Sequence, residues 1–132
     1  VVSAWNQKFL DIERYAAGYR PGPAPRALAY IGMANYEACV AGMPEFNSQA
    51  FNYAGLSIPQ ASADQEYHWP AVVNASTAYL MRRFFPNNAD EINALETQYR
   101  NKYLAETTQE VYDRSAAHGE AVAAAVWEWS KT

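Results

Sequence analysis

Cysteine is almost absent from this sequence, which contains only Cys39 in 132 residues. A single thiol cannot form an internal disulfide, and it cannot supply the ligands of a cysteine zinc site or an iron–sulfur cluster. Long apolar runs are absent as well. The longest extends from Ala121 to Trp127, whereas a membrane-spanning helix needs roughly 20 apolar residues. The sequence therefore predicts neither a cysteine-based centre nor a membrane span.

Positive charge is scarce too, since 10 basic residues stand against 14 acidic ones and the net charge is -4. Nucleic acids are bound mainly through Lys and Arg side chains that neutralise phosphates, and this chain has no excess of positive charge for that purpose. The glycine-rich phosphate motifs and the G-x-S-x-G serine motif are also missing. We therefore predict no nucleic-acid partner, and we assign no catalytic, cofactor-binding or metal-binding residue in this chain.

Helical periodicity is what the sequence contains in place of such motifs. In the first stretch, one helix face is formed by Val2, Trp5, Phe9, Ile12 and Ala16. Asn88 with Glu91 and Thr107 with Glu110 have the spacing of a helix-capping pair. No segment alternates apolar and polar residues as a strand does. The sequence therefore predicts an all-α bundle of about five helices at 2–17, 24–42, 70–85, 89–105 and 108–130, with a long loop at 43–68.

Two of the predicted helices carry further information about packing. The helix at 24–42 has a broad apolar surface, so we expect it to be buried on several sides. The last helix has small residues at every fourth position, namely Ser115, Gly119 and Ala123. Because glycine costs a helix about 1 kcal/mol relative to alanine, we expect another helix to approach closely there. With Val122 and Val126, this face is also where we expect a second polypeptide to dock.

The candidate chemical groups are few, and the residues themselves favour structural roles for them. Asp64, Glu66 and His68 alternate along the predicted loop, and we interpret them as solvated rather than metal-binding. His118 and Cys39 lie on packed helices, which indicates a hydrogen-bonded core histidine and a small core residue.

Three polar positions on the helix at 70–85 are interpreted in the same way. Asn74-Ala-Ser76 fits a glycosylation sequon, but its position inside a helix makes it coincidental. The neighbouring Arg82 and Arg83 point in different directions and are expected at the surface.

Aromatic residues are abundant, with 4 Trp, 10 Tyr and 5 Phe. Each aromatic side chain buries about 150–250 Å², which is more than a small free-standing bundle accommodates easily. We therefore expect many of these side chains to meet another piece of protein.

Four stretches of the chain, taken in order, resemble one known family. Stretch 23–38 reads Pro-Ala-Pro-Arg-Ala-Leu-Ala-Tyr-Ile-Gly-Met-Ala-Asn-Tyr-Glu-Ala. Stretch 5–10 has Trp-Asn-Gln and a leucine, stretch 68–75 has His-Trp-Pro-Ala and then Asn-Ala, and stretch 115–129 has Ser-x-x-x-Gly-x-x-Val-Ala and a tryptophan. Together they resemble the N-terminal helical part of vanadium-dependent haloperoxidases and of their type 2 phosphatidic acid phosphatase relatives.

The resemblance implies that these residues are a helical scaffold within one larger domain. The complete enzyme would oxidise a halide with hydrogen peroxide at a bound vanadate. The family builds its vanadate pocket from a Lys/Arg-rich stretch, a Pro-Ser-Gly-His segment and a later Arg with His, and none of these motifs occurs in the chain. Vanadate is therefore expected on the C-terminal part and not on these residues. Arg26 and Trp129 are expected as buried packing or hydrogen-bonding anchors, and the loop at 43–68 as part of the entrance.

The resemblance also implies partners and a location. A C-terminal fragment of the same protein, or another chain, would complete the fold, and secretion or export to the periplasm is expected. Two alternatives stay open at this point. One is an acid phosphatase of the same superfamily, which would take a phosphate ester in place of peroxide and halide. The other is a helical binding module without catalysis.

Overall fold

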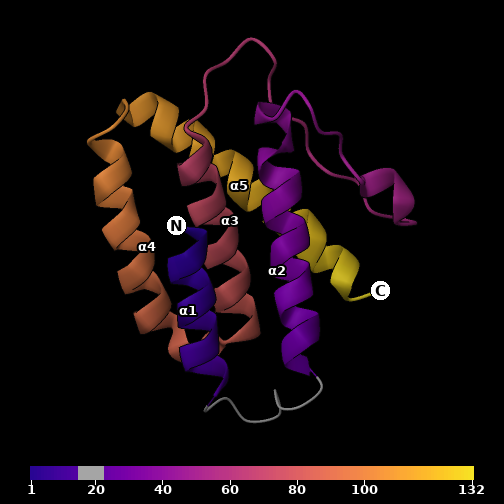
Figure 1. The fold of residues 1–132 in the computed structure, drawn as a ribbon, viewed down its shortest axis with the longest axis vertical. Coiled ribbons are helices and arrows are strands. Elements are labelled where there is room, and N and C mark those ends of the chain that lie inside the picture. The colour runs from indigo at the N-terminus through magenta and orange to yellow at the C-terminus, as the bar shows by residue number, and fades with distance from the viewer. Residues whose placement is uncertain (15–22) are drawn as a thin grey trace.

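The computed structural model describes residues 1–14 and 23–132, and its regular structure is helical (Figure 1). The five main helices are α1 (Val2–Glu13), α2 (Pro23–Cys39), α3 (Trp69–Phe84), α4 (Ala89–Leu104) and α5 (Gln109–Ser130). Three short 3₁₀ turns are η1 (Val40–Gly42), η2 (Ala50–Asn52) and η3 (Pro86–Asn88). The described residues contain no strand. The predicted all-α class, the five helices and the long loop before α3 are confirmed.

The predicted boundaries differ from the observed ones mainly at the ends of α1 and α2. α1 ends at Glu13, with Arg14 at its C-cap, and the predicted extension over 15–17 lies outside the described residues. α2 ends at Cys39, after which the predicted helical residues 40–42 form the tighter turn η1. No helix in the described part of the chain is long and apolar enough to cross a membrane.

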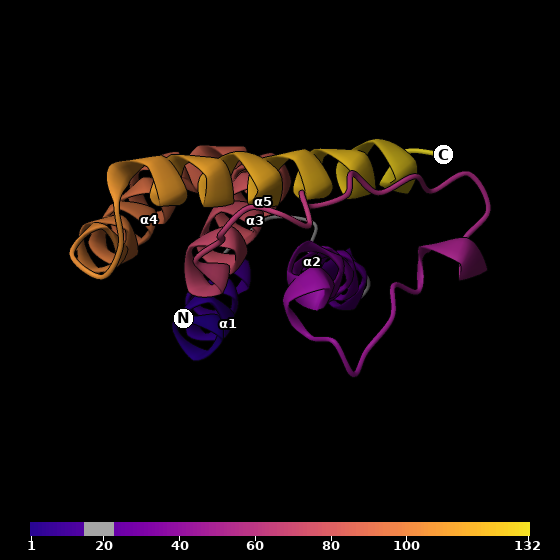
Figure 2. The same cartoon turned by 90° about the horizontal axis from the view of Figure 1, so that it is seen from above.

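α3 is the helix around which the others are arranged. It packs against α1, α2, α4 and α5, and every residue from 71 to 78 is buried. Seen from above, α5 crosses one side of α3 and α2, while α1 lies on the opposite side of α3 (Figure 2). α3 is narrow enough for four helices to pack around it because many of its buried residues are small. These small residues are Ala71, Ala75, Ser76 and Ala78. The polar side chains of α3 are consequently enclosed with the apolar ones.

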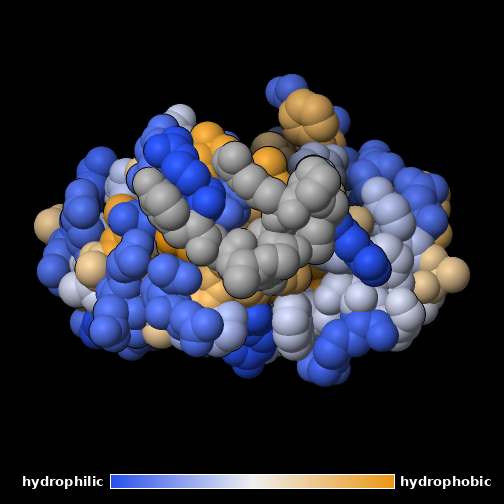
Figure 3. All heavy atoms as spheres, turned by 90° about the horizontal axis from the view of Figure 1, so that it is seen from below, coloured by the Kyte–Doolittle hydropathy of each residue, from blue (hydrophilic) through white to orange (hydrophobic). Residues whose placement is uncertain are grey.

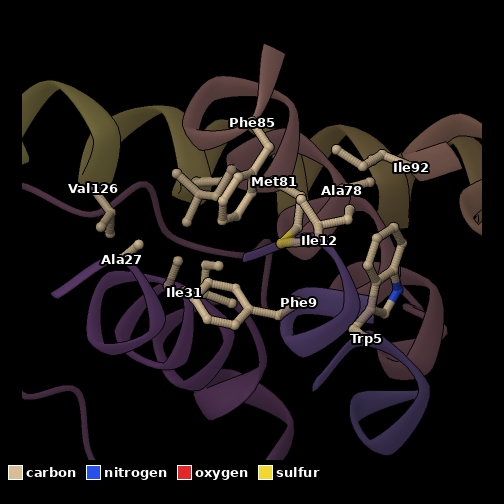
Figure 4. Packing of buried hydrophobic residues seen from close by; sticks show 13 residues of the cluster. Trp5, Phe9, Ile12, Ala27, Ile31, Ala78, Met81, Phe85, Ile92 and Val126 are labelled. Atoms are coloured by element: carbon tan, nitrogen blue, oxygen red, sulfur yellow. The ribbon is translucent and has the colours of Figure 1, made fainter. Parts of the chain in front are cut away.

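The main hydrophobic core draws side chains from all five helices, most of them from α1, α2 and α3, and these side chains point toward one another (Figure 4). Trp5, Phe9 and Ile12 form the buried face of α1 at helical spacing. Phe9 meets Phe85 edge to face, with ring centroids 5.5 Å apart. Val2, predicted for the same face, is 47% exposed, and Ala16 lies outside the described residues. The predicted periodicity of α1 is therefore confirmed from its second turn onward.

The prediction that α2 is buried on several sides is wrong. Its buried apolar residues share one face, and they are Ala27, Ile31, Ala34 and Ala38. Leu28 is 40% exposed and Gly32 is exposed. α2 lies at the edge of the bundle against α3 and α5, so only one of its faces can be covered. Ala29 on the other face is exposed, where alanine favours the helix through its intrinsic propensity and does not require burial.

The face of α5 that carries small residues packs against α3 of the same chain. A Cβ atom placed on Gly119 would collide with the carbonyl oxygen of Val72 and would lie 3.2 Å from the backbone nitrogen of Ser76. Ser115, Val122, Ala123 and Val126 on this face are buried as well. The predicted close helix approach is confirmed. The expectation that a second polypeptide docks on this face is wrong, because α3 occupies it.

The capping residues also differ from the predicted pairs. Thr108, not Thr107, caps α5, and its hydroxyl accepts a hydrogen bond from the backbone N–H of Val111 at 3.2 Å. Asn88 stands at the N-cap of α4, but its side-chain amide donates to the Glu91 carboxylate at 3.2 Å and caps no helix N–H. The register of a cap depends on backbone conformation, and the extended backbone required at an N-cap falls on Thr108.

The aromatic side chains largely pack against one another within the chain. Tyr30 stacks on Phe84 with centroids 6.4 Å apart, and Phe84 meets Trp127 edge to face at 5.3 Å. Large apolar side chains that stay exposed include Val2, Leu10, Leu28, Phe46, Phe51 and Tyr53. Seen from below, polar side chains cover much of the visible surface, with apolar ones exposed between them (Figure 3). Internal packing thus accounts for much of the aromatic content that the sequence analysis assigned to a partner.

Two glycine substitutions test the contact between α3 and α5. Gly119→Ala is expected to lower the free energy of unfolding by about 3 kcal/mol, because the new methyl group meets backbone atoms that cannot move aside. Gly32→Ala is the matched control, since nothing lies within 4 Å of the added Cβ, and it is expected to raise the same quantity by about 0.5 to 1 kcal/mol. Urea unfolding followed by circular dichroism measures both. Equal effects of the two substitutions would contradict the close contact.

Candidate functional site

Three buried polar side chains of α3 form the centre of the candidate site. Asn74, Ser76 and Thr77 are exposed by only 1%, 0% and 1%. A polar group in a protein interior costs free energy unless it is hydrogen-bonded. The hydrogen-bond partners of these three residues therefore show what role the side chains have in the bundle.

Asn74 connects three helices. Its Oδ1 accepts a hydrogen bond from Nε1 of Trp5 in α1 at 2.9 Å, and its Nδ2 donates to the carbonyl oxygen of Glu96 in α4 at 3.2 Å. Because this amide is buried and both of its ends are bonded, it is not available for glycosylation in the folded chain. The interpretation of the sequon as coincidental agrees with this position.

The other two polar side chains of α3 differ in how they are satisfied. Thr77 Oγ1 donates to Oδ1 of Asn35 in α2 at 3.0 Å, which adds a second link between helices. The Ser76 hydroxyl is buried, and none of the described residues hydrogen-bonds to it. Its hydroxyl group therefore contributes nothing to the network that Asn74 and Thr77 share.

His68 starts α3 and has both ring nitrogens engaged. Nδ1 accepts from the backbone N–H of Ala71 at 3.2 Å, so the neutral ring carries its proton on Nε2, which lies 3.1 Å from the Glu106 carboxylate. The backbone N–H of His68 donates to Ser115 Oγ at 2.8 Å, which fixes the start of α3 on α5. Asp64 and Glu66 are exposed, as interpreted from the sequence, but the same interpretation is wrong for His68, whose side chain is only 15% exposed because both of its ring nitrogens are bonded to the protein.

The capping role of His68 was missed in the sequence analysis. A signal was present, because His-Trp-Pro places a hydrogen-bond acceptor two residues before a proline of the first helical turn. The three-residue spacing to Ala71 is that of an N-cap bond.

His118 ties α5 to the end of α2. Its Nε2 lies 3.1 Å from the carbonyl oxygen of Ala38, and its ring packs against Tyr67 and Trp69 at centroid distances of 5.5 and 6.4 Å. Burial among these rings lowers the pKa of His118 from its ordinary 6.5, and the bond to Ala38 opposes this shift only in part. The interpretation of His118 as a hydrogen-bonded packing residue is confirmed, although its ring is half-buried and not fully enclosed.

Glu37 fixes the loop at 43–68 onto the bundle. Its side chain is 3% exposed, and its two carboxylate oxygens accept hydrogen bonds from the Ser48 hydroxyl at 2.6 Å and from the backbone N–H of Gln49 at 2.8 Å. The neighbouring Tyr36 hydroxyl donates to the Asn47 carbonyl at 2.8 Å. A buried carboxylate is stable when bonded in this way. Sequence reasoning missed Glu37 because nothing in its local pattern indicates a partner 11 residues away.

The two residues expected as buried anchors behave differently. Trp129 donates from Nε1 to the carbonyl oxygen of Ala54 at 2.9 Å and contacts the rings of Tyr30 and Tyr53, so its anchoring role is confirmed with a half-buried side chain. Arg26 is exposed, so the expectation that it is buried is wrong, although its Nε donates a hydrogen bond to the Tyr30 hydroxyl at 3.1 Å. Arg26 lies in the first turn of α2, beside the ends of α3 and α5.

The remaining candidates have ordinary surroundings. Cys39 is half-buried, and burial raises the pKa of its thiol, which keeps the protonated and less nucleophilic form at neutral pH. Arg82 forms an ion pair with Glu96 at 2.8 Å, whereas Arg83 stacks over the ring of Tyr79 at 4.0 Å. The prediction of a surface position holds for Arg83, which is exposed, while Arg82 is partly buried.

The described residues do not fit a vanadate site. An oxyanion of this kind needs several convergent cationic or N–H donors, with an imidazole among them. The rings of His68 and His118 are committed to backbone and carboxylate partners in separate places, and Arg82 is paired with a carboxylate. Within residues 1–14 and 23–132, no three His, Cys, Asp or Glu side chains are grouped so that they could hold a metal ion.

Comparison of the chain with models of known protein families, with curated proteins and with solved structures found no match.

The bond between Trp5 and Asn74 gives a test of the polar network. Asn74→Ala is expected to lower the free energy of unfolding by about 2 to 4 kcal/mol, because it leaves the Trp5 N–H and the Glu96 carbonyl without their partner in the core. Ser76→Ala, which removes an equally buried but unbonded hydroxyl, is the control and is expected to be neutral or stabilising. Chemical denaturation measures both, and similar losses for the two variants would contradict the network.

The lowered pKa of His118 gives a test by pH. The unfolded chain binds a proton at this ring more readily than the folded chain, so stability is retained above pH 6.5 and decreases as the pH falls toward the lower folded pKa. Urea unfolding between about pH 8 and pH 5 should therefore show a steeper loss for the native chain than for His118→Phe. Since His68 is present in both proteins, equal slopes would rule out His118 as the source.

Proposed function

We propose that residues 1–132 are the N-terminal helical scaffold of a vanadium-dependent haloperoxidase-like enzyme, in which other residues of the complete protein hold the vanadate. The observation that supports this proposal is the way in which the four stretches that carry the resemblance are joined. They are far apart in sequence, yet each one bonds to another in the fold.

The four stretches are connected to one another by specific hydrogen bonds. Trp5 and Asn74 join stretch 5–10 to stretch 68–75 at 2.9 Å, across 69 residues of sequence. The backbone N–H of His68 joins stretch 68–75 to Ser115 of stretch 115–129 at 2.8 Å. His118 in stretch 115–129 joins the Ala38 carbonyl of stretch 23–38 at 3.1 Å. The residues of the resemblance therefore act together as one interhelical network, as residues of a shared scaffold do.

The same scaffold positions the loop at 43–68, which is the part of this chain that would contribute to an entrance. Glu37 holds the loop at Ser48 and Gln49, and Trp129 holds it at Ala54. Between these attachments Phe51 is 82% exposed, so an aromatic side chain is presented from a fixed backbone. In the proposed enzyme this segment borders the path of the peroxide and the halide.

Two alternatives follow from the same observations. An acid phosphatase of the superfamily would use the same scaffold, with phosphate esters in place of peroxide and halide. A helical binding module without catalysis is favoured by one specific feature, the exposed aromatic side chains of Phe46 and Phe51 on the anchored loop.

The deciding experiment uses the complete gene product that contains this chain. With orthovanadate added, it is expected to oxidise bromide or iodide with hydrogen peroxide, and chelation or competition by phosphate should abolish the reaction. Hydrolysis of a phosphomonoester without vanadate, and no halide oxidation, would instead identify the phosphatase. If neither activity is observed with folded protein, the enzyme proposal is wrong and the binding module is the better account.

A further inference from the structure

An open cleft of about 260 Å³ lies where the start of α2, the end of α3 and the end of α5 meet. Its lining consists of Arg26, Tyr30, Phe84, Trp127, Ser130 and Lys131, together with one alanine. We call it the Arg26–Lys131 cleft.

Aromatic rings form the walls of this cleft. The rings of Tyr30 and Phe84 are nearly parallel, at an interplanar angle of 11°, and Trp127 meets Phe84 edge to face. Because each ring is fixed by its neighbour, the walls are already ordered before anything enters. Such a surface favours a flat aromatic group over an aliphatic chain of similar volume, since stacked and edge-to-face contacts are available to it.

Two positive charges stand at the mouth of the cleft. The Nε of Arg26 donates to the Tyr30 hydroxyl at 3.1 Å, which holds the side chain over that ring, and no described residue bonds to its two terminal nitrogens. Lys131 pairs with Glu128 at 2.9 Å, but both side chains are more than half exposed. An exposed pair of this kind contributes little, so Lys131 can exchange its partner for a ligand.

None of the described residues that line the cleft is acidic, and Glu128, the exposed partner of Lys131, lies outside this lining, although the chain has 14 acidic and 10 basic residues overall. The cleft is therefore locally positive in a protein whose net charge is -4. Its volume of about 260 Å³ is below the range of about 300–1,000 Å³ that is usual for drug-sized ligands, which limits the occupant to one ring and its substituent.

We propose that the Arg26–Lys131 cleft binds a small single-ring aromatic anion, with the ring against Tyr30, Phe84 and Trp127 and the carboxylate or phosphate group between Arg26 and Lys131. The ring contributes the buried contact, and the two cations select the negative charge. This inference is independent of the vanadate chemistry, because it uses only the side chains of this chain.

The test is a titration of the ¹⁵N-labelled chain followed by backbone and indole N–H shifts in NMR spectra. Benzoate and phenyl phosphate are the two anionic probes. The probe that binds with the higher affinity shows whether the cleft prefers a carboxylate or a phosphate group. Benzamide has the ring without the charge, and inorganic phosphate has the charge without the ring, so both are expected to bind at least about fivefold more weakly. The largest shifts should fall at Tyr30, Trp127 and Lys131.

Matched variants separate the cleft from general surface charge. Arg26→Gln and Lys131→Gln are each expected to weaken benzoate binding about fivefold, and the double variant more than either. Arg83→Gln and Lys102→Gln are the controls, because each also removes a cation that lies over a tyrosine ring but outside the cleft. All four positions are exposed, so folded protein is expected for every variant.

Four results would overturn the proposal. The first is equal binding of benzamide and benzoate, and the second is a set of shifts centred away from the cleft. The third is an equal effect of the cleft and control variants. Absence of any saturable shift up to about 10 mM probe would overturn it as well, since that excludes even a weak site.

Discussion

The close approach of α5 to α3 at Gly119 is the constraint on which the rest of this structure depends. With no side chain at that position, the backbone of α5 reaches the carbonyl of Val72, and α3 becomes enclosed on that side. A helix enclosed by four others cannot turn its polar residues to water. Asn74 and Thr77 must therefore find partners on α1, α2 and α4, and their bonds in turn fix how those helices lie.

The elements could be predicted from the sequence because helical periodicity is a local signal. Trp5, Phe9 and Ile12 show this periodicity in α1. Gly119 indicated a close contact because glycine is an unfavourable residue inside a helix. What occupied that contact could not be predicted, since the residues of α3 that meet Gly119, Val72 and Ser76, lie more than 40 residues earlier in the chain. The extent of burial of α2 was misjudged for a related reason: alanine is compatible with both a core and an exposed helix face.

The candidate site was less predictable than the fold, because its bonds connect distant segments. Trp5 and Asn74 are 69 residues apart, and His118 and Ala38 are 80 apart, so no spacing rule within one element reveals them. Glu37 shows the same difficulty over a shorter distance, since a buried glutamate looks in sequence like any surface one. The cap at His68 is different, because its signal was local and could have been found beside the proline of α3.

The two attachments of the loop at 43–68 have a consequence for how its length can vary. Residues 47–54 are held by Tyr36, Glu37 and Trp129, so an insertion there would displace bonds to the bundle. Residues 62–65, by contrast, are exposed and hydrogen-bonded only to neighbours within the loop. Lengthening a flexible loop costs only about 0.6 kcal/mol per doubling. Relatives of this chain can therefore differ in length at 62–65 while they keep the same anchored aromatic segment.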